Sequence, residues 1–387
     1  MAQTQVTRRQ VLVGIGCLGV SMLTACGGTA ATTPAVAPTG AATAPVRATA
    51  LATPATTSTS APTAGIPSTP SSAGSPTAKP AAGARQKVSM VYPGPGTLIF
   101  LPFEVARTQG FFTDQGIDID ITYSKGGPPA VSALTSNSID FAGASMDLAL
   151  NSFKQSKIIT MVASLTRLPA FAVVGKVATL KELQGKKVGI SNVGAGDQLI
   201  LQYLLKKQGA DLTKVEYVAV GPDEAKINAL SANQIDGAIV QEPALTILKG
   251  KGTTVLANLY DRQQATDAFG GDYQFTGLVT RPDVIKEKAA LVRSMVLATA
   301  NANRFVATHN GEQITMNLPD QAIIGGDKAA FAKIVDAYKQ AIYSPDAKIQ
   351  PDDVATVARV QQESGALTGA IPDMTQFFTN SFLEGAS

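Results

Sequence analysis

Histidine, cysteine and tryptophan are scarce in this 387-residue sequence, which has one histidine, two cysteines and no tryptophan. A metal site built from histidines and cysteines needs about four such ligands, so the count excludes one. A Ser-His-Asp mechanism would have to use His309. That residue stands at the expected end of a long helix, where it is better placed as a C-terminal cation than as a general base. We therefore expect neither an enzyme nor a bound cofactor or metal.

A strong excess of charge of one sign is missing as well. The chain has 32 basic and 29 acidic residues, but five of the basic residues precede residue 86. The rest of the chain therefore carries 27 basic against 29 acidic residues. Domains that bind nucleic acid usually carry a basic patch and a high isoelectric point. The balance of charge gives no such indication, and we expect no nucleic-acid partner.

The N-terminus has the pattern of an export signal. The paired arginines of Thr7-Arg8-Arg9-Gln10 precede an apolar run, residues 11–25, that ends in the small residues of Leu23-Thr24-Ala25-Cys26. A positively charged start, an apolar middle and small residues before the cleavage site are typical of a secretory signal. This cleavage site resembles the lipobox of bacterial lipoproteins, and the arginine pair resembles a twin-arginine signal. We expect residues 1–25 to be removed, Cys26 to carry lipid, and the protein to be extracytoplasmic and anchored to the cell membrane.

Two other interpretations of this N-terminus are weaker. An uncleaved transmembrane anchor needs about 20 apolar residues, and the run offers only 15. Cys17 is a poor lipidation site, because the run before it is short and Gly14 stands where a branched residue is expected. Cleavage before Cys26 leaves a single cysteine, so an internal disulfide is excluded.

Residues 26–85 have low complexity. After Cys26 they are almost wholly alanine, threonine, proline, serine and glycine, with no acidic or aromatic residue. Such a composition buries too little apolar surface to offset the entropy lost on ordering. We expect this segment to be a lipidated cysteine followed by a disordered tether.

From Gln86 onward, strand and helix patterns alternate. Strands are expected at 87–92, 117–121, 139–144 and 158–163, and again at 186–191, 215–220 and 238–241. An apolar helix is expected between the first two strands, and a long helix from Pro282. This βαβα order, punctuated by glycine, is typical of open sheets with helices on both faces. The fold class is therefore α/β.

Four stretches resemble one protein family in family order. They are ARTQGFFTDQGIDIDI (106–121), GGPPAVSALTSNSIDFAGAS (126–145), TLKELQGKKVGIS (179–191) and ALSANQIDGAIVQEPA (229–244). They resemble the solute-binding lipoproteins of ABC importers, in the nitrate, sulfonate, taurine and thiamine-precursor-binding group. The resemblance extends from about residue 87 to residue 383.

The resemblance implies a two-lobed periplasmic-binding-protein clam-shell of type II. Lobe one would be residues 87–170 and 275–387, and lobe two would be residues 171–274. A monomer would capture a small organic solute or oxyanion, sulfonate-, nitrate-, taurine- or pyrimidine-like, and deliver it to a permease with its ATPase. The alternatives are a ligand-sensing lipoprotein and an exported enzyme.

In open α/β sheets, ligands bind beyond the carboxyl ends of strands, where helix N-termini point main-chain amides outward. This rule selects the loops after the expected strands as the ligand site. The expected ligand-binding residues are Tyr92, Gly94, Thr97, Gly126, Ser145, Met146, Asp147, Ser164, Thr166, Arg167, Asn192, Val193, Gly194, Ala195, Gln241 and Glu242.

Each of these residues also has a purely structural interpretation. The glycines can serve turns, Ser145 can cap a helix, and Glu242-Pro243 can end a strand. The charge of the ligand also stays open. Asp147 beside Glu242 would disfavour a small anion and favour an amine or a heterocycle with N–H donors. Arg167 and the helix N-termini favour a sulfonate, carboxylate or phosphate.

Overall fold

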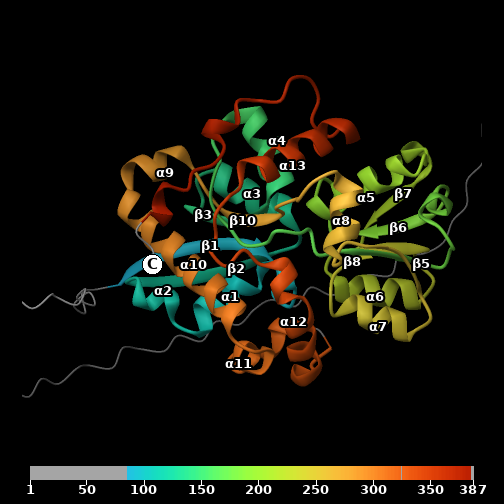
Figure 1. The fold of residues 1–387 in the computed structure, drawn as a ribbon, viewed down its shortest axis with the longest axis horizontal. Coiled ribbons are helices and arrows are strands. Elements are labelled where there is room, and N and C mark those ends of the chain that lie inside the picture. Colours follow the sequence, from blue (N-terminus) through green and yellow to red (C-terminus); the bar gives the residue numbers. More distant parts are fainter. Residues whose placement is uncertain (1–84, 324, 385–387) are drawn as a thin grey trace, which may run out of the picture. The chain divides into compact units, whose positions relative to one another are not determined.

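The computed structural model describes residues 85–323 and 325–384 (Figure 1). The expected signal peptide, the lipidation site at Cys26 and the tether as far as residue 84 lie outside the described residues. Among the helices of the described part, none has the length and the apolar character needed to cross a membrane.

The described residues form two sheets, of which the first is mixed and has five strands. In spatial order these are β2 (Ile117–Ser124), β1 (Gln86–Pro93), β3 (Phe141–Ser145), β10 (Thr276–Thr280) and β4 (Thr160–Ser164). β1 runs parallel to β2 and β3, whereas β10 runs antiparallel to both β3 and β4. In β2 the aspartates of the alternating sequence are exposed and the isoleucines are buried or half-buried, so one face of this strand meets solvent. In contrast, β3 and β4 are buried throughout.

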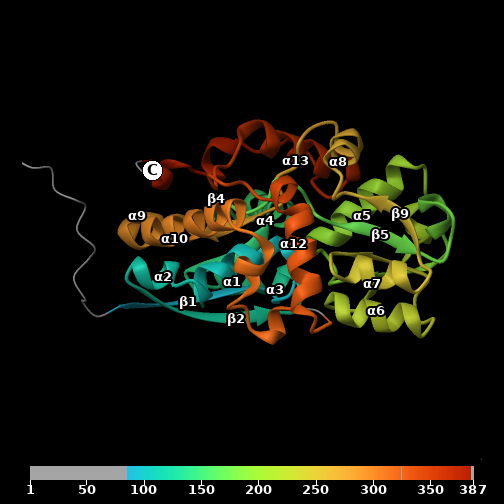
Figure 2. The ribbon, with the colours of Figure 1, turned by 60° about the horizontal axis from the view of Figure 1, so that its bottom comes forward.

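Helices surround this sheet. α3 packs on β1 and β3, while α10 packs on α1 and β4 (Figure 2). We call this sheet with its helices lobe one. Its helices are α1 (Leu101–Thr108), α2 (Phe111–Asp114), α3 (Gly127–Thr135), α4 (Met146–Ser156), α9 (Pro282–Glu287), α10 (Ala289–Thr308), α11 (Gly311–Thr315), α12 (Lys328–Ile342) and α13 (Pro351–Ser364).

The second sheet also has five strands, in the order β7 (Glu216–Ala219), β6 (Lys187–Ile190), β8 (Gly237–Val240), β5 (Ala172–Gly175) and β9 (Thr254–Asn258). β6 is parallel to β7 and β8, and β5 is antiparallel to β8 and β9. Its helices are α5 (Gly196–Lys207), α6 (Asp223–Ser231), α7 (Ala244–Gly250) and α8 (Arg262–Phe269). α6 and α7 lie side by side on one face and α5 covers the other (Figures 1 and 2). We call this sheet with its helices lobe two.

Short 3-10 helices complete the described residues, at Leu98–Phe100, Leu180–Leu183, Leu212–Lys214, Asp320–Ala322, Met374–Gln376 and Ser381–Leu383. One helical prediction needs correction. The long helix expected from Pro282 is interrupted at Lys288, whose φ of −127° and ψ of 37° depart from helical values. Its ammonium group lies 2.6 Å from Asp140 Oδ2.

The chain passes between the two sheets twice, at residues 165–171 and 259–275. The two crossing segments are hydrogen-bonded to each other. The amide of Leu165 donates to the carbonyl of Thr276 (2.8 Å), and the amide of Phe275 donates to the carbonyl of Thr166 (3.1 Å). The hydroxyls of Thr166 and Thr276 are 2.9 Å apart. These bonds join the two crossing segments, which we also call the connections, where the lobes meet.

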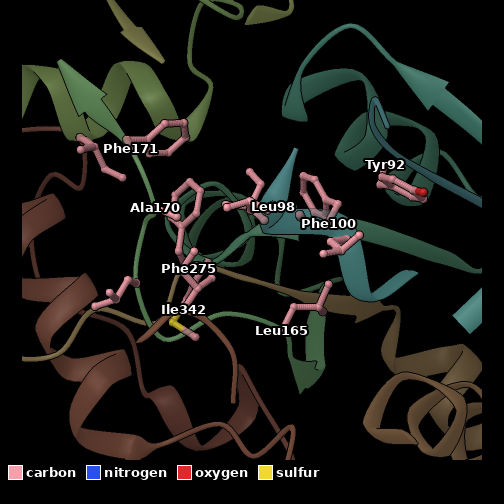
Figure 3. Close-up of a cluster of buried hydrophobic side chains, with 14 of the residues drawn as sticks. Tyr92, Leu98, Phe100, Leu165, Ala170, Phe171, Phe275 and Ile342 are labelled. Atoms are coloured by element: carbon pink, nitrogen blue, oxygen red, sulfur yellow. The ribbon is translucent and has the colours of Figure 1, made fainter. Parts of the chain in front are cut away.

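A hydrophobic cluster surrounds the crossing segments (Figure 3). Its members are buried in lobe one, in lobe two and in the connections between them. The rings of Phe171 and Phe275, one from each connection, meet edge to face with centroids 5.2 Å apart. Such a contact contributes beyond the area that it buries. The labelled members are Tyr92, Leu98, Phe100, Leu165, Ala170, Phe171, Phe275 and Ile342.

Candidate functional site

A cavity of about 610 Å³ lies where residues of the two lobes come together. This volume is in the range of pockets that hold small organic molecules. Lobe one and the crossing segments supply Pro93, Gly94, Pro95, Thr97, Ile99, Phe100, Ser124, Lys125, Gly126, Gly127, Ser145, Phe171, Phe275, Thr276, Asp320, Gln321, Ile323, Gly325 and Gly326. Lobe two supplies Ser191, Ala195, Gly196, Asp197, Pro222, Asp223, Glu224, Lys226 and Gln241.

The topology of the sheets explains this location. β1 and β3 end at Pro93 and Ser145, β6 ends at Ile190, and β8 ends at Val240. Pro93 and Ser145 line the cavity themselves, as do Ser191 and Gln241, which follow β6 and β8. The carboxyl ends of the parallel strands in both sheets therefore face the same cavity, as expected for a ligand site in α/β sheets.

A buried ion cluster forms the wall on the lobe-two side. Lys226, with 1% of its side chain exposed, lies 3.1 Å from Asp197 Oδ2 and 3.0 Å from Asp223 Oδ1. It also donates to the carbonyl of Ile239 at 2.9 Å. Burial opposes its charge, but the carboxylates of Asp223 and Asp197 outweigh it and raise the pKa of Lys226. Asp197 further accepts the amide and the hydroxyl of Ser191, at 2.7 and 2.6 Å.

Two polar atoms of the wall have no hydrogen-bond partner among the described residues. They are Nε2 of Gln241 in lobe two and Oγ1 of Thr97 in lobe one. Gln241 is held in place because its main-chain amide donates to Asp223 Oδ2 at 2.7 Å. A buried polar group without a partner is costly. Both atoms are covered in this conformation, so a bound molecule reaches them only after the side chains turn toward the cavity.

Apolar side chains form much of the remaining wall. Phe100 lies beside the buried Tyr92 of lobe one, and Phe171 and Phe275 come from the two connections (Figure 3). All three are buried, with 2–4% of their surface exposed. The arrangement suits an organic molecule with an apolar portion better than a bare inorganic ion.

Six of the residues that the sequence predicted for ligand binding line the cavity: Gly94, Thr97, Gly126, Ser145, Ala195 and Gln241. The rim adds a contact between lobes, in which Asn192 Nδ2 donates to the carbonyl of Lys125 at 3.1 Å. The adjacent Val193 is 66% exposed, and the amide of Gly194 donates to Gln198. These three residues border the cavity without lining it.

The other predicted residues do not line the cavity. Tyr92 is buried and bonds to the carboxylate of Glu104, which Tyr123 and Arg107 also reach at 2.7 and 2.8 Å. Glu242 caps α7, because its carboxylate accepts the amide and the hydroxyl of Thr246 at 2.9 and 3.0 Å. The remaining residues in this group are Met146, Ser164, Thr166 and Arg167, of which the first three are buried.

Asp147 lies behind the wall, between the N-terminal turns of α4 and α5. It is fully buried, and its Oδ1 accepts the amide of Leu148 at 2.7 Å. A Cβ placed on Gly196 would approach this oxygen to 2.9 Å, so only glycine fits there. Burial raises the pKa of Asp147 to about 6. The carboxyl is therefore part of the contact between lobes, and it does not face Glu242 across the cavity.

Replacing Asp147 by asparagine is expected to stabilise the protein at neutral pH by roughly 1–3 kcal/mol. The pKa of Asp147 in the folded protein is about 6 and its ordinary value is 3.8, so the folded state holds the proton more tightly. The free energy of unfolding therefore falls as the pH rises from about 4 to about 6. Asparagine removes this loss, because it does not ionise and its oxygen can still accept the amide of Leu148.

Urea denaturation at about pH 4 and about pH 8 measures the effect. The variant should gain on the wild type at the higher pH and little at the lower one. Asp211→Asn is the control, because hydrogen bonds from Thr213 lower the pKa of that exposed carboxyl; it should show no gain. An advantage of equal size at both pH values for Asp147→Asn would contradict the assigned ionisation.

Several wall residues were missed by the sequence prediction. Asp223 and Lys226 are three residues apart on α6 and have the pattern of a solvated ion pair, but both are buried. Phe171 and Phe275 stand at the two expected boundaries between the lobes, so an aromatic residue at each boundary was an available signal. The segment from Asp320 to Gly326 follows neither a strand nor a helix pattern, and no signal marked it.

Among the described residues, no group of three or more histidine, cysteine, aspartate and glutamate side chains has the arrangement of a metal site. The single histidine caps α10, where its ring stacks on Phe305 with centroids 3.7 Å apart. His309 is not among the residues that line the cavity.

Comparison with known proteins places this architecture in a family. The family model described as NMT1/THI5 like matches residues 99–313. A putative binding protein of Bacillus subtilis, YtlA, is 22% identical over 71% of this chain and 83% of its own length. A putative binding protein of Brucella abortus is 28% identical over 54% of this chain and 63% of its own length.

Solved structures confirm the expected fold class. A protein of Bordetella bronchiseptica superimposes with a TM-score of 0.71 at 22% identity, over 78% of this chain and 96% of that one. The ligand-binding component of an ABC-type import system from Staphylococcus aureus gives 0.62 at 17% identity, over 78% and 99%. A Candida albicans protein with the generic periplasmic binding protein fold gives 0.59 at 13% identity, over 76% and 96%.

Two further neighbours of this fold differ from each other in what they do. The alkanesulfonate-binding protein SsuA from Xanthomonas axonopodis, bound to MOPS, has a TM-score of 0.61 at 16% identity, over 77% of this chain and all of its own. The desulfurization enzyme DSZB has 0.55 at 13% identity, over 77% and 98%. The fold alone therefore does not separate binding from catalysis, and the residues of the cavity must decide.

Proposed function

Because this chain belongs to the NMT1/THI5-like family, we propose that it is the extracytoplasmic solute-binding component of an ABC importer. It binds a small organic solute between its two lobes, closes around it and delivers it to a membrane permease driven by an ATPase. The wall of the cavity supplies hydrogen bonds and apolar contact. It performs no chemistry on the solute.

One observation carries this proposal. The cavity of about 610 Å³ is lined by both lobes, and each lobe contributes a polar atom without a partner, Thr97 Oγ1 and Gln241 Nε2. A molecule that bonds to both would hold the lobes together. The two crossing segments, which are hydrogen-bonded to each other near Thr166 and Thr276, form a short hinge about which the lobes can move.

The sequence supports the cellular setting of this function. The small-residue exit before Cys26 favours a lipid anchor at the membrane, where the permease also lies. The low-complexity segment that follows favours a tether that lets the binding lobes reach the permease. A ligand-sensing lipoprotein would bind a solute in the same way. Genes for a permease and an ATPase beside the gene for this protein would favour import over sensing.

The enzyme alternative has less support. His309 is the only histidine of the chain, and it caps α10 outside the cavity wall. Lys226 is held by two carboxylates, which raise its pKa and keep it from acting as a base or nucleophile near neutral pH. The cavity thus offers binding groups and no activated nucleophile among its described residues.

A cognate solute at 100 times its dissociation constant is expected to raise the free energy of unfolding by about 2.7 kcal/mol. For a protein of this size that corresponds to a rise of roughly 5 °C in melting temperature. The measurement is thermal denaturation of the purified chain against a library of small metabolites, after any solute carried through purification has been removed by denaturation and refolding. A refolded, cooperative sample that responds to no compound would contradict a solute-binding function.

A further inference from the structure

Three helices begin at the cavity, and each has an aspartate in its first turn. Asp147 is in α4, Asp197 in α5 and Asp223 in α6, and all three are at least nine-tenths buried. The helices have 11, 12 and 9 residues. Helix N-termini of this length normally attract anions, because their first amides are unpaired and carry partial positive charge.

Here the chain's own carboxylates stand at those helix ends, and those of Asp147 and Asp197 accept an amide of their own first turn. Asp147 accepts the amide of Leu148, Asp197 accepts the amide of Gln198 at 3.0 Å, and Asp223 accepts the amide of Gln241. An anionic group on a solute would have to approach these same helix ends against a negative side chain. The three helix ends therefore do not form an anion site.

The charged side chains of the wall also have a negative balance. The described cavity residues include four carboxylates, those of Asp197, Asp223, Glu224 and Asp320, against the two lysines Lys125 and Lys226. No arginine is among them. Lys226 is already engaged by two carboxylates. Arginine or free lysine is the usual partner of a sulfonate, phosphate or carboxylate group, and the described wall offers neither on its lobe-two side.

The uncharged part of the wall suits an organic cation. Phe100, Phe171 and Phe275 present aromatic surface to the cavity, and aromatic rings attract cations through their negative faces. Glu224 is exposed at the start of α6, and its side chain has no hydrogen bond or ion pair among the described residues. The buried donor Gln241 Nε2 can donate to an acceptor elsewhere on the same molecule, and a carbonyl or ether oxygen supplies one without adding negative charge.

We propose, on the basis of the proposed binding function, that the solute is an organic ammonium compound with no anionic group. Its cationic nitrogen lies toward Asp223 and Glu224 at the start of α6. Its apolar part lies against the phenylalanines of the connections, and a neutral oxygen accepts from Gln241. The site excludes sulfonates, although the fold is shared with a sulfonate-binding protein.

Matched series of compounds test this proposal. In each series one alkyl or aryl skeleton of fixed size carries an ammonium, an amide or a sulfonate group, and isothermal calorimetry measures binding to the refolded full chain. The ammonium member should bind at least tenfold more tightly than its sulfonate partner. Any solute extracted from the purified protein should have a basic nitrogen by mass spectrometry in both polarities.

Two different failures are distinguishable. If sulfonates or amides bind as tightly as the ammonium compounds, or if the extracted solute is an acid, the solute-binding function stands and the cation proposal is overturned. If no compound of any class binds and no solute is extracted, the binding function fails, and the cation proposal fails with it.

Glu224→Gln provides the test within the chain. It removes one charge from the wall at constant size, and it should weaken ammonium binding three- to tenfold while leaving a neutral amide unaffected. Glu312→Gln is the matched control, because Glu312 is also exposed in the first turn of a helix and is not among the cavity residues. Ammonium binding that both variants leave unchanged would contradict the role of Glu224.

Discussion

Replacing Lys226 by methionine is expected to destabilise the folded protein by about 3–5 kcal/mol. The side chain is 1% exposed, and its ammonium group lies 3.1 Å from Asp197 and 3.0 Å from Asp223, which are also buried. Methionine fills a similar volume but leaves two carboxylates close together without a cation. A buried charge that loses its partner costs more than the pair contributed, because its hydration was given up on folding.

Two further variants separate this effect from a loss of packing. In the triple variant Lys226→Met, Asp197→Asn and Asp223→Asn, no charge is left unpaired, and most of the stability should return. Lys214→Met removes an exposed ion pair with Asp211, whose side chains are 63% and 44% exposed; it should cost less than about 1 kcal/mol. Urea denaturation measures all three. A loss below about 1 kcal/mol for Lys226→Met would mean that water or protons already neutralise the carboxylates.

The sheets could be predicted because their sequence signals are local. The alternation in residues 117–121 depends only on one face in solvent and one packed face, and β2 has both. Glycine after apolar runs, as at Gly110 with its φ of 83°, marks places where only a residue without a side chain adopts the backbone easily. The loops after the strands could then be selected as a site from topology alone.

The individual wall residues could not be predicted, because they depend on which helix face turns inward. Helical periodicity predicts that polar residues such as Lys226 are solvated. Lys226 is instead buried, and its ammonium group donates to Asp197, which is 29 positions away in the chain. The sequence left open whether Asp147 lies beside Glu242. In the structure it contacts the first turn of α5 at Gly196, since the two lobes meet at that point. Contacts between lobes have no local sequence signal, and this is why the sequence left the charge of the ligand open.

Gly94 offers a way to fill the cavity without disturbing the fold. It follows β1 in the cavity wall, and a Cβ at this position would meet no heavy atom within 4 Å. Its backbone is not among the positive-φ conformations that favour glycine. Tryptophan should therefore be accepted there, and its ring would occupy space that a solute needs. Gly94→Trp is expected to weaken binding of whichever compound the wild type binds by at least a hundredfold, which is about 2.7 kcal/mol.

The natural chain contains no tryptophan, so the fluorescence of the introduced ring also reports its own surroundings. Gly250→Trp at the end of α7 is the matched control. Its Cβ also meets open space, and the residue is exposed and outside the cavity wall. Both variants should unfold at the same urea concentration as the wild type, and only Gly94→Trp should lose binding. If Gly94→Trp kept wild-type affinity, the solute would have to bind elsewhere. The side chains of Gln241 and Thr97 would then not take part in binding the solute.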